Sequence, residues 1–253
     1  MSVDMPITKE NLDTYLKELG KRYRRINGKA MPVEIILIGG ASILINYGFR
    51  DSTYDVDAVI GAASAMKDAI NYVTDQLGLP NGWFNDDFKY TKSYSPRLVQ
   101  FSQYYRTFSN VLRVRTVTGE YLVAMKLMAF RQYKHDISDI VGILREHANS
   151  GDPLTWERID TAVCDLYDSW ANMPENAQSL IKSILADEDL DALYDAYAQE
   201  ETAAKDALIT FEGKYPDVLK EDNLADILNH LLGQQDDTDQ DDGETQGPVL
   251  GGT

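Results

Sequence analysis

The stretch that most constrains the fold is residues 33–60, in which two apolar segments flank a glycine pair and a short amphipathic segment. Residues 33–38 are rich in β-branched apolar side chains, which predicts a buried strand. Gly39 and Gly40 follow, and glycine lets a backbone turn without a Cβ clash. The pattern over residues 41–47 then fits a short helix. The stretch therefore predicts a strand, a glycine turn and a helix.

The glycine turn is also a predicted phosphate site. The first N–H groups of a helix have no internal acceptor, and the positive end of the helix dipole lies beside them. Gly39 and Gly40 leave these N–H groups accessible, and Ser42 offers a hydroxyl donor.

Two aspartates one residue apart mark the second apolar segment, residues 54–60. Side chains alternate between the faces of a strand, so Asp55 and Asp57 point the same way, with Cα atoms roughly 7 Å apart. Two uncompensated carboxylates on so apolar a strand are costly, and a hard divalent cation is the usual remedy. We therefore predict that both carboxylates hold Mg²⁺, together with substrate phosphate. The alternative, two solvated residues on an edge strand, is disfavoured by the apolar character of residues 35–38 and 56–60.

A glycine pair followed by an Asp-x-Asp strand resembles the signature of the nucleotidyltransferase superfamily. The closer resemblance is to bacterial nucleotidyltransferase-like toxins of abortive-infection and type IV toxin–antitoxin systems. In those proteins an Arg-x-Thr-x-Asp-hydrophobic-Asp run contributes to the nucleotide site. Arg50 and Thr53 stand in that run here, with one residue more before the threonine. The resemblance covers roughly residues 30–145.

The resemblance also implies a lysine on a later helix and a further aspartate. Lys126 occupies the comparable place for the lysine, where it would pair with phosphate as a point charge. Asp136 and Asp139 are both candidates for a third acidic group, being one helical turn apart. Asp139 is preferred as the catalytic residue, because Asp136 is better explained as a helix cap.

By this resemblance the chain is an α+β protein, with a nucleotidyltransferase-type mixed sheet flanked by helices. The implied activity is magnesium-dependent transfer of a nucleotide from an NTP to an acceptor, possibly tRNA, as a toxin with a possible antitoxin partner. One departure favours an alternative, a catalytically inactive binding module that acts through protein partners. Polymerase-type members carry a third carboxylate on a strand near residues 111–117, where this chain has only Thr116 and Thr118 as candidates.

Charge is distributed unevenly along the chain. Residues 1–150 carry 19 Lys and Arg against 16 Asp and Glu, whereas residues 151–253 carry 5 against 25, which together return the net charge of −17. Because phosphates are attracted by positive charge, RNA is expected to bind the first half. No apolar run is long enough to cross a membrane and the first residues do not resemble a signal peptide, so a cytoplasmic location is expected.

The pattern divides the chain into a nucleotidyltransferase-like domain at 1–150, a helical domain at 151–233 and a disordered acidic tail at 234–253. Between the predicted elements of the first domain lies a loop, residues 80–97, that is rich in turn formers and aromatic residues. Trp83, Phe84, Tyr90 and Tyr94 in this loop either stack on a nucleobase or pack on the sheet. Other elements are predicted as helices over 9–26, 64–77, 119–133, 137–146 and four segments between 156 and 232, and as strands over 98–105 and 111–117.

Overall fold

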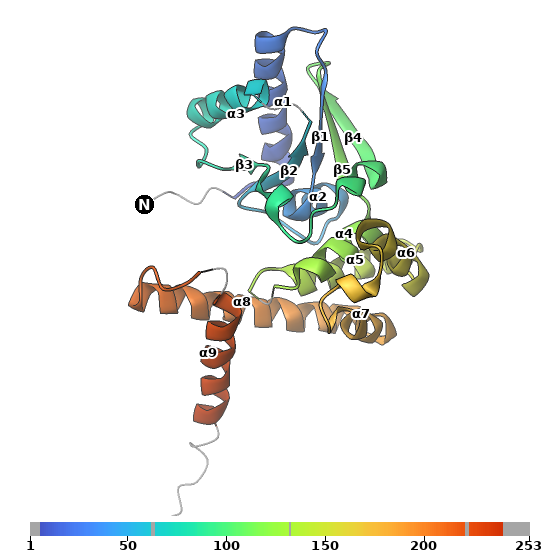
Figure 1. Cartoon of the computed structure of the whole chain (residues 1–253), viewed down its shortest axis with the longest axis vertical. Coiled ribbons are helices and arrows are strands. Elements are labelled where there is room, and N and C mark those ends of the chain that lie inside the picture. Colours follow the sequence, from blue (N-terminus) through green and yellow to red (C-terminus); the bar gives the residue numbers. More distant parts are fainter. Residues whose placement is uncertain (1–5, 62–63, 132, 221–222, 240–253) are drawn as a thin grey trace, which may run out of the picture.

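The structure is a computed structural model that describes residues 6–61, 64–131, 133–220 and 223–239. Its centre is a five-stranded mixed sheet in the order β3-β2-β1-β5-β4 (Figure 1). β1 pairs parallel with β5 and antiparallel with β2, while β3 runs parallel to β2 and β4 antiparallel to β5. The strands are β1 Val33–Leu37, β2 Val56–Ile60, β3 Phe84–Asn85, β4 Ser102–Phe108 and β5 Leu112–Val117. The expectation of an α+β fold with a mixed sheet is confirmed.

β1 and β2 are interior strands, because each has a neighbour on both sides. Both faces of β1 are covered. Ile35 and Leu37 join a core with the helices α1 (Lys9–Asn27) and α3 (Ser64–Leu77), whereas Ile36 joins a second core on the opposite face. Burial on both faces explains why this strand is apolar at nearly every position. The edge-strand alternative is therefore wrong.

The β4–β5 hairpin starts later than predicted. A 3-10 helix, η2 (Pro96–Phe101), occupies the first half of the stretch expected as a strand, with its proline at the start. Proline has no N–H to give to a ladder and its φ suits the first turn of a helix. The hairpin closes at Ser109 and Asn110, whose positive φ values of 53° and 59° match the right-handed twist of the strands.

Six α-helices follow the sheet in the described part of the chain. They are α4 Gly119–Ala129, α5 Asp136–Asn149, α6 Trp156–Tyr167, α7 Ala177–Ala186, α8 Leu190–Lys214 and α9 Leu224–Asp239. α4 packs on α5 and α6, and α8 packs along α5, so that these helices lie beneath the sheet in Figure 1. The second core is continuous across residue 150, the predicted boundary between the first two domains.

The acidic tail was expected to lack structure from residue 234 onward. α9 extends to Asp239, six residues into that stretch, and disorder of the tail stays a prediction. Residues 240–253 lie outside the described part of the chain. Within the described part, none of the helices combines the length and the apolar character that crossing a bilayer requires.

Candidate active site

The carboxylate of Asp57 lies beside the glycine turn that follows β1. The backbone N–H of Ile38, the last residue before the turn, donates to the carbonyl oxygen of Asp57 at 3.0 Å. A Cβ atom on Gly39 would stand 3.8 Å from Oδ2 of Asp57. Asp55 lies just before β2, close enough that its charge raises the pKa of Asp57. The turn and the carboxylate pair therefore form one site.

The two glycines of the turn are needed for different reasons. Gly39 has φ +52°, a left-handed conformation that side chains other than glycine rarely adopt. Gly40 is needed for space, because a Cβ there would stand 2.7 Å from Oγ1 of Thr53 and 3.2 Å from the guanidinium of Arg50. α2 (Gly39–Asn46) begins at this turn, so its free N–H groups open beside the carboxylates.

The carboxylate pair carries negative charge that the protein only partly neutralises. The pKa of Asp57 is raised above its ordinary value, first by burial and then by the neighbouring Asp55. A hydrogen bond from Asn85 and the charges of Lys134 and Arg131 lower it only in part. A divalent cation would neutralise the remaining negative charge. Two carboxylates are the usual protein ligands of Mg²⁺ when phosphates supply other ligands.

The residues present therefore fit a divalent cation that is shared with a phosphate substrate. In the described part of the chain, no group of three His, Cys, Asp or Glu side chains could hold a metal ion without such help. β5 adds no carboxylate to the site. The residues of β5 on the same face as Asp57 are Arg115, which pairs with Ile36, and Val117. Thr116 points to the opposite face and donates a hydrogen bond to Asn46.

Lys126 belongs to a cluster of five charged side chains, of which the lysine and the two carboxylates are buried. Its Nζ lies 2.7 Å from Asp136 Oδ1 and 2.8 Å from Asp139 Oδ2. Arg131 Nε lies 2.9 Å from Asp136, and Arg50 Nη1 lies 2.6 Å from Asp139. Burial alone lowers the pKa of Lys126, but the two carboxylates outweigh it and keep the amine charged. The cluster carries three positive and two negative charges, so it presents a net positive charge.

Asp136 does not cap α5, so that prediction is wrong. It is the first residue of the helix, the cap position is His135, and the carboxylate of Asp136 binds Lys126 and Arg131 instead. Burial by itself raises the pKa of Asp136, but Lys126 and Arg131 lower it to about 2. The first N–H groups of α5 are instead bound by Glu201 of α8, at 2.8 Å from Ile137 N.

Three other predicted residues have contacts inside the fold. The Ser42 hydroxyl accepts from Val117 N at 3.0 Å in the core. Thr53 is buried against Gly40, and Arg50 donates to the Ser52 carbonyl oxygen as well as to Asp139. These contacts shape the turn, and none of the three lines the cavity described next.

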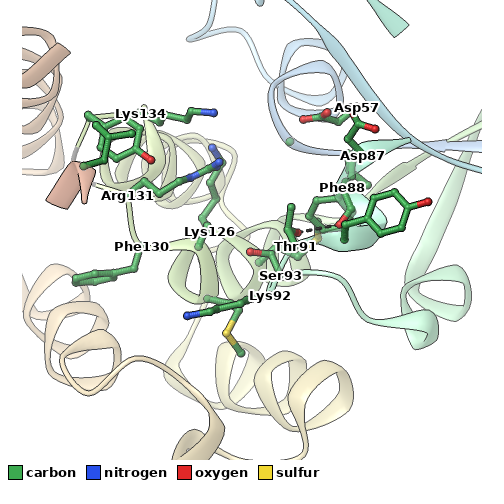
Figure 2. Close-up of a pocket in the computed structure, with 18 of the residues that line it drawn as sticks. Asp57, Asp87, Phe88, Thr91, Lys92, Ser93, Lys126, Phe130, Arg131 and Lys134 are labelled. Carbon is green, nitrogen blue, oxygen red and sulfur yellow. Dashed lines mark hydrogen bonds between the residues drawn. The ribbon is translucent and has the colours of Figure 1, made fainter. Parts of the chain in front are cut away.

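A cavity of about 1010 Å³ opens between the sheet and the helices. Asp55, Asp57 and Gly39 line one side. Lys126, Arg131 and Lys134 face them, and Figure 2 shows these cations across the cavity from Asp57. The remaining wall comes from residues 85–93, from α4 and from Leu224, Ala225, Leu228 and Asn229 of α9. Asp139 is not part of the lining.

The aromatic residues of the 80–97 loop divide between packing and exposure. Trp83 and Phe84 are buried, and the Trp83 indole donates to Thr74 at 2.9 Å. Phe88 and Tyr94 pack edge to face. Tyr90 is 88% exposed and lies on the cavity.

Sequence reasoning missed Arg131 and Lys134, because the predicted helix 119–133 placed the first of them inside a regular element. α4 ends at Ala129, and Phe130 adopts a left-handed conformation with φ 46°. The chain then turns so that both cations face the carboxylates. A signal was present in the sequence: an arginine, a lysine and a histidine fall within residues 131–135, between two apolar helical patterns. For the part of the cavity wall that α9 provides, the sequence contained no comparable signal.

A mixed sheet whose first strand ends in a glycine turn, beside an Asp-x-Asp strand and across a cavity from fixed cations, defines a nucleotidyltransferase. A family model described as "Nucleotidyltransferase of unknown function (DUF6036)" matches residues 14–180, well over half of the chain. The chain belongs to this family, whose description indicates an enzyme that transfers nucleotides. No curated protein and no solved structure matches it.

Proposed function

We propose that this protein is a magnesium-dependent enzyme that moves a nucleotide from an NTP to a hydroxyl acceptor in this cavity. The observation that carries the proposal is the pairing of opposite charges across one space. Asp55 and Asp57 lie beside the N–H groups of the glycine turn, and Arg131 and Lys134 face them. A triphosphate with a bound cation is the ligand whose charges complement both sides.

The chain's own residues would bind and orient the triphosphate. The N–H groups at Gly39 and Gly40 would donate hydrogen bonds to phosphate oxygens, and Arg131 and Lys134 would supply positive charge from the opposite wall. Asp55 and Asp57 would hold Mg²⁺, which when bound neutralises charge that develops on the phosphates. The acceptor oxygen forms a bond to the α-phosphorus, the bond from that phosphorus to the pyrophosphate oxygen breaks and pyrophosphate leaves, and the hydroxyl proton passes to water.

Two features support RNA as the acceptor, with tRNA the first to test. The half of the chain that contains the sheet is net positive, whereas the remainder carries 25 acidic residues against 5 basic ones. The resemblance to nucleotidyltransferase-like toxins adds growth arrest as the expected cellular result and an antitoxin as the expected partner. Expression of the wild type should then arrest growth, and expression of Asp57→Asn should not.

The decisive experiment incubates the purified chain with each α-labelled NTP, Mg²⁺ and total RNA, and follows the label into RNA, protein and small molecules. We expect one NTP to label an acceptor, and Asp57→Asn to lower the rate by at least about 100-fold, since a metal contributes several kcal/mol to the transition state. Removing Mg²⁺ with EDTA should have the same effect.

Asp51→Asn is the matched control, because Asp51 is an exposed aspartate six residues earlier that does not line the cavity. It should transfer at the wild-type rate. Transfer by Asp57→Asn at the wild-type rate would overturn the metal site. NTP binding without any product over a panel of acceptors would instead favour the inactive binding module.

A further inference from the structure

Tyr90 is an exposed aromatic residue on the wall of the cavity. At 88% exposure it is the most exposed of the large apolar or aromatic side chains in the described part of the chain. Within that part its side chain has no hydrogen bond and no ring contact. Because the exposed ring of Tyr90 lies on the wall of the cavity, its face is accessible to a ligand that enters there.

The backbone on both sides of Tyr90 is held in place. Lys89 Nζ donates to the Ile60 carbonyl at the end of β2 at 3.2 Å and to Asp86 at 2.9 Å. Three residues after Tyr90, the Ser93 carbonyl accepts from the hydroxyl of Tyr167 of α6 at 2.7 Å. The ring is therefore exposed from an anchored segment, η1 (Asp87–Tyr90) and the residues that follow it, which packs against β2.

A lysine two residues after Tyr90 also lines the cavity. Lys92 is exposed, lines the same cavity and has no ion-pair partner among the described residues. Asp86, an acid of the same segment, is already paired with Lys89, and Asp87 lies toward Asp57 in Figure 2. An anchored aromatic ring beside an unpaired lysine is the combination that binds single-stranded nucleic acid, in which bases stack and phosphates pair with cations.

We propose that Tyr90 and Lys92 form the acceptor entrance of this site, where the terminal base of a single-stranded nucleic acid stacks on Tyr90 and a phosphate binds Lys92. The inference rests on the proposed function, and it names the acceptor class and the residues that bind it. In a duplex the terminal bases stay paired and stacked on their neighbours, so a duplex end offers Tyr90 less base surface on which to stack.

The test measures binding of a fluorescein-labelled, unstructured 12-nucleotide RNA to the full chain by anisotropy. We expect Tyr90→Ala to weaken binding roughly 5- to 150-fold, the range that base–aromatic stacking contributes. Tyr90→Trp should restore it, and affinity for a non-hydrolysable NTP with Mg²⁺ should not change in either variant. Tyr104→Ala is the matched control, because Tyr104 is 59% exposed on β4 and does not line the cavity.

Salt dependence gives an independent reading. Lys92→Gln should reduce the slope of log K against log salt by about 0.7, the value for one phosphate contact in a single strand. Lys17→Gln, at an exposed position of α1, should leave the slope unchanged. Equal RNA affinity of Tyr90→Ala and the wild type, or a wild type that binds no single-stranded RNA, overturns the inference.

These measurements need no turnover, so they separate the two proposals. RNA binding that depends on Tyr90, found together with no transfer to any acceptor, supports the binding surface and counts against the proposed function alone. Transfer by the wild type that proceeds equally well in Tyr90→Ala supports the function and overturns the entrance.

Discussion

At the scale of single residues, the site depends on groups that are unfavourable for the fold by themselves. Gly39 adopts a left-handed conformation, Gly40 leaves room for Thr53 and Arg50, and Asp57 holds a carboxylate next to that of Asp55. Such features persist where function requires them, because a substitution that relaxes them removes the binding geometry.

Asp57 should show directly that a group required by the site destabilises the fold. Its folded pKa is raised by burial and by Asp55, so ionisation destabilises the fold, and the associated stability is lost as pH rises through the folded pKa. Asp57→Asn should therefore melt at a higher temperature than the wild type at pH 7 in EDTA, and the difference should shrink toward pH 4. Adding Mg²⁺ and a non-hydrolysable NTP should stabilise only the wild type. An Asp57→Asn chain that melts lower in EDTA would contradict the electrostatic account.

Gly40→Ala should destabilise the chain by about 1–3 kcal/mol, as overpacking in a filled interior does. The added methyl would stand 2.7 Å from Thr53 Oγ1, and that side chain is buried. Urea unfolding measures the change. Gly213→Ala is the matched control, because no atom of the described residues lies within 4 Å of a Cβ at that position of α8, and alanine is the better helix former. It should leave stability equal or higher.

At the scale of elements, the joint between α4 and α5 is held by charges rather than by apolar contacts alone. Lys126 and Arg131 bind Asp136, and Lys126 and Arg50 bind Asp139. The joint also turns Arg131 toward the carboxylates of the site. Buried ion pairs of this kind add little net stability but are costly to break, so they fix an arrangement.

Asp136→Asn should cost about 3–5 kcal/mol at pH 7, because it leaves Lys126 and Arg131 without a full partner. The pKa of Asp136 is lowered from 3.8 to about 2, which corresponds to about 2 kcal/mol of stability that is present above pH 4 and lost as pH falls toward 2. The difference between wild type and variant should narrow over that interval in denaturant titrations.

Asp191→Asn provides the comparison, since Asp191 pairs with Arg145 but is 80% exposed. An exposed pair contributes at most about 1 kcal/mol. Equal effects of the two substitutions would show that burial of the cluster has no energetic consequence.

At the scale of the whole molecule, the cavity is assembled from parts far apart in sequence. β2 and the glycine turn provide one side, α4 and the joint after it provide the cations, and α9 closes part of the wall. α9 is attached through a small core in which Leu228 packs with Ala204 and Leu208 of α8. The acidic half of the chain thus contributes to a site whose catalytic groups lie in the basic half.

Leu228→Ala should loosen α9 without unfolding the sheet. Truncating a fully buried leucine costs about 2–5 kcal/mol, and the core around it is small, so the cost falls on the attachment of α9. Hydrogen exchange should show lost protection in α9 with β1 and β5 unchanged, and NTP affinity should fall. Ile209→Ala, at a 60% exposed position of α8, should do neither. Loss of protection across the sheet would contradict the local account.

Prediction from sequence succeeded where the signal was local. Strand, glycine turn, helix and second strand lie within 28 residues, and period-two alternation alone places Asp55 and Asp57 on one side. It failed for Asp136, since a polar residue at a helix start matches a cap whether or not a buried lysine lies opposite. The end of α4 was missed because Phe130 is an unusual residue for a left-handed position.

By itself the sequence determined the order of elements, the turn and the carboxylate pair, because each depends on residues next to one another in the chain. Only the tertiary structure decided which charged side chains form ion pairs with one another and which line the cavity. Asp139 is bound within the ion cluster and does not line the cavity, whereas Lys126 and Arg131 are bound in the cluster and also line the cavity, as Lys134 does. It also decided that α9, more than 160 residues after Asp57, completes the wall. Side-chain pairing across such separations depends on how the elements pack, and periodicity carries no information about it.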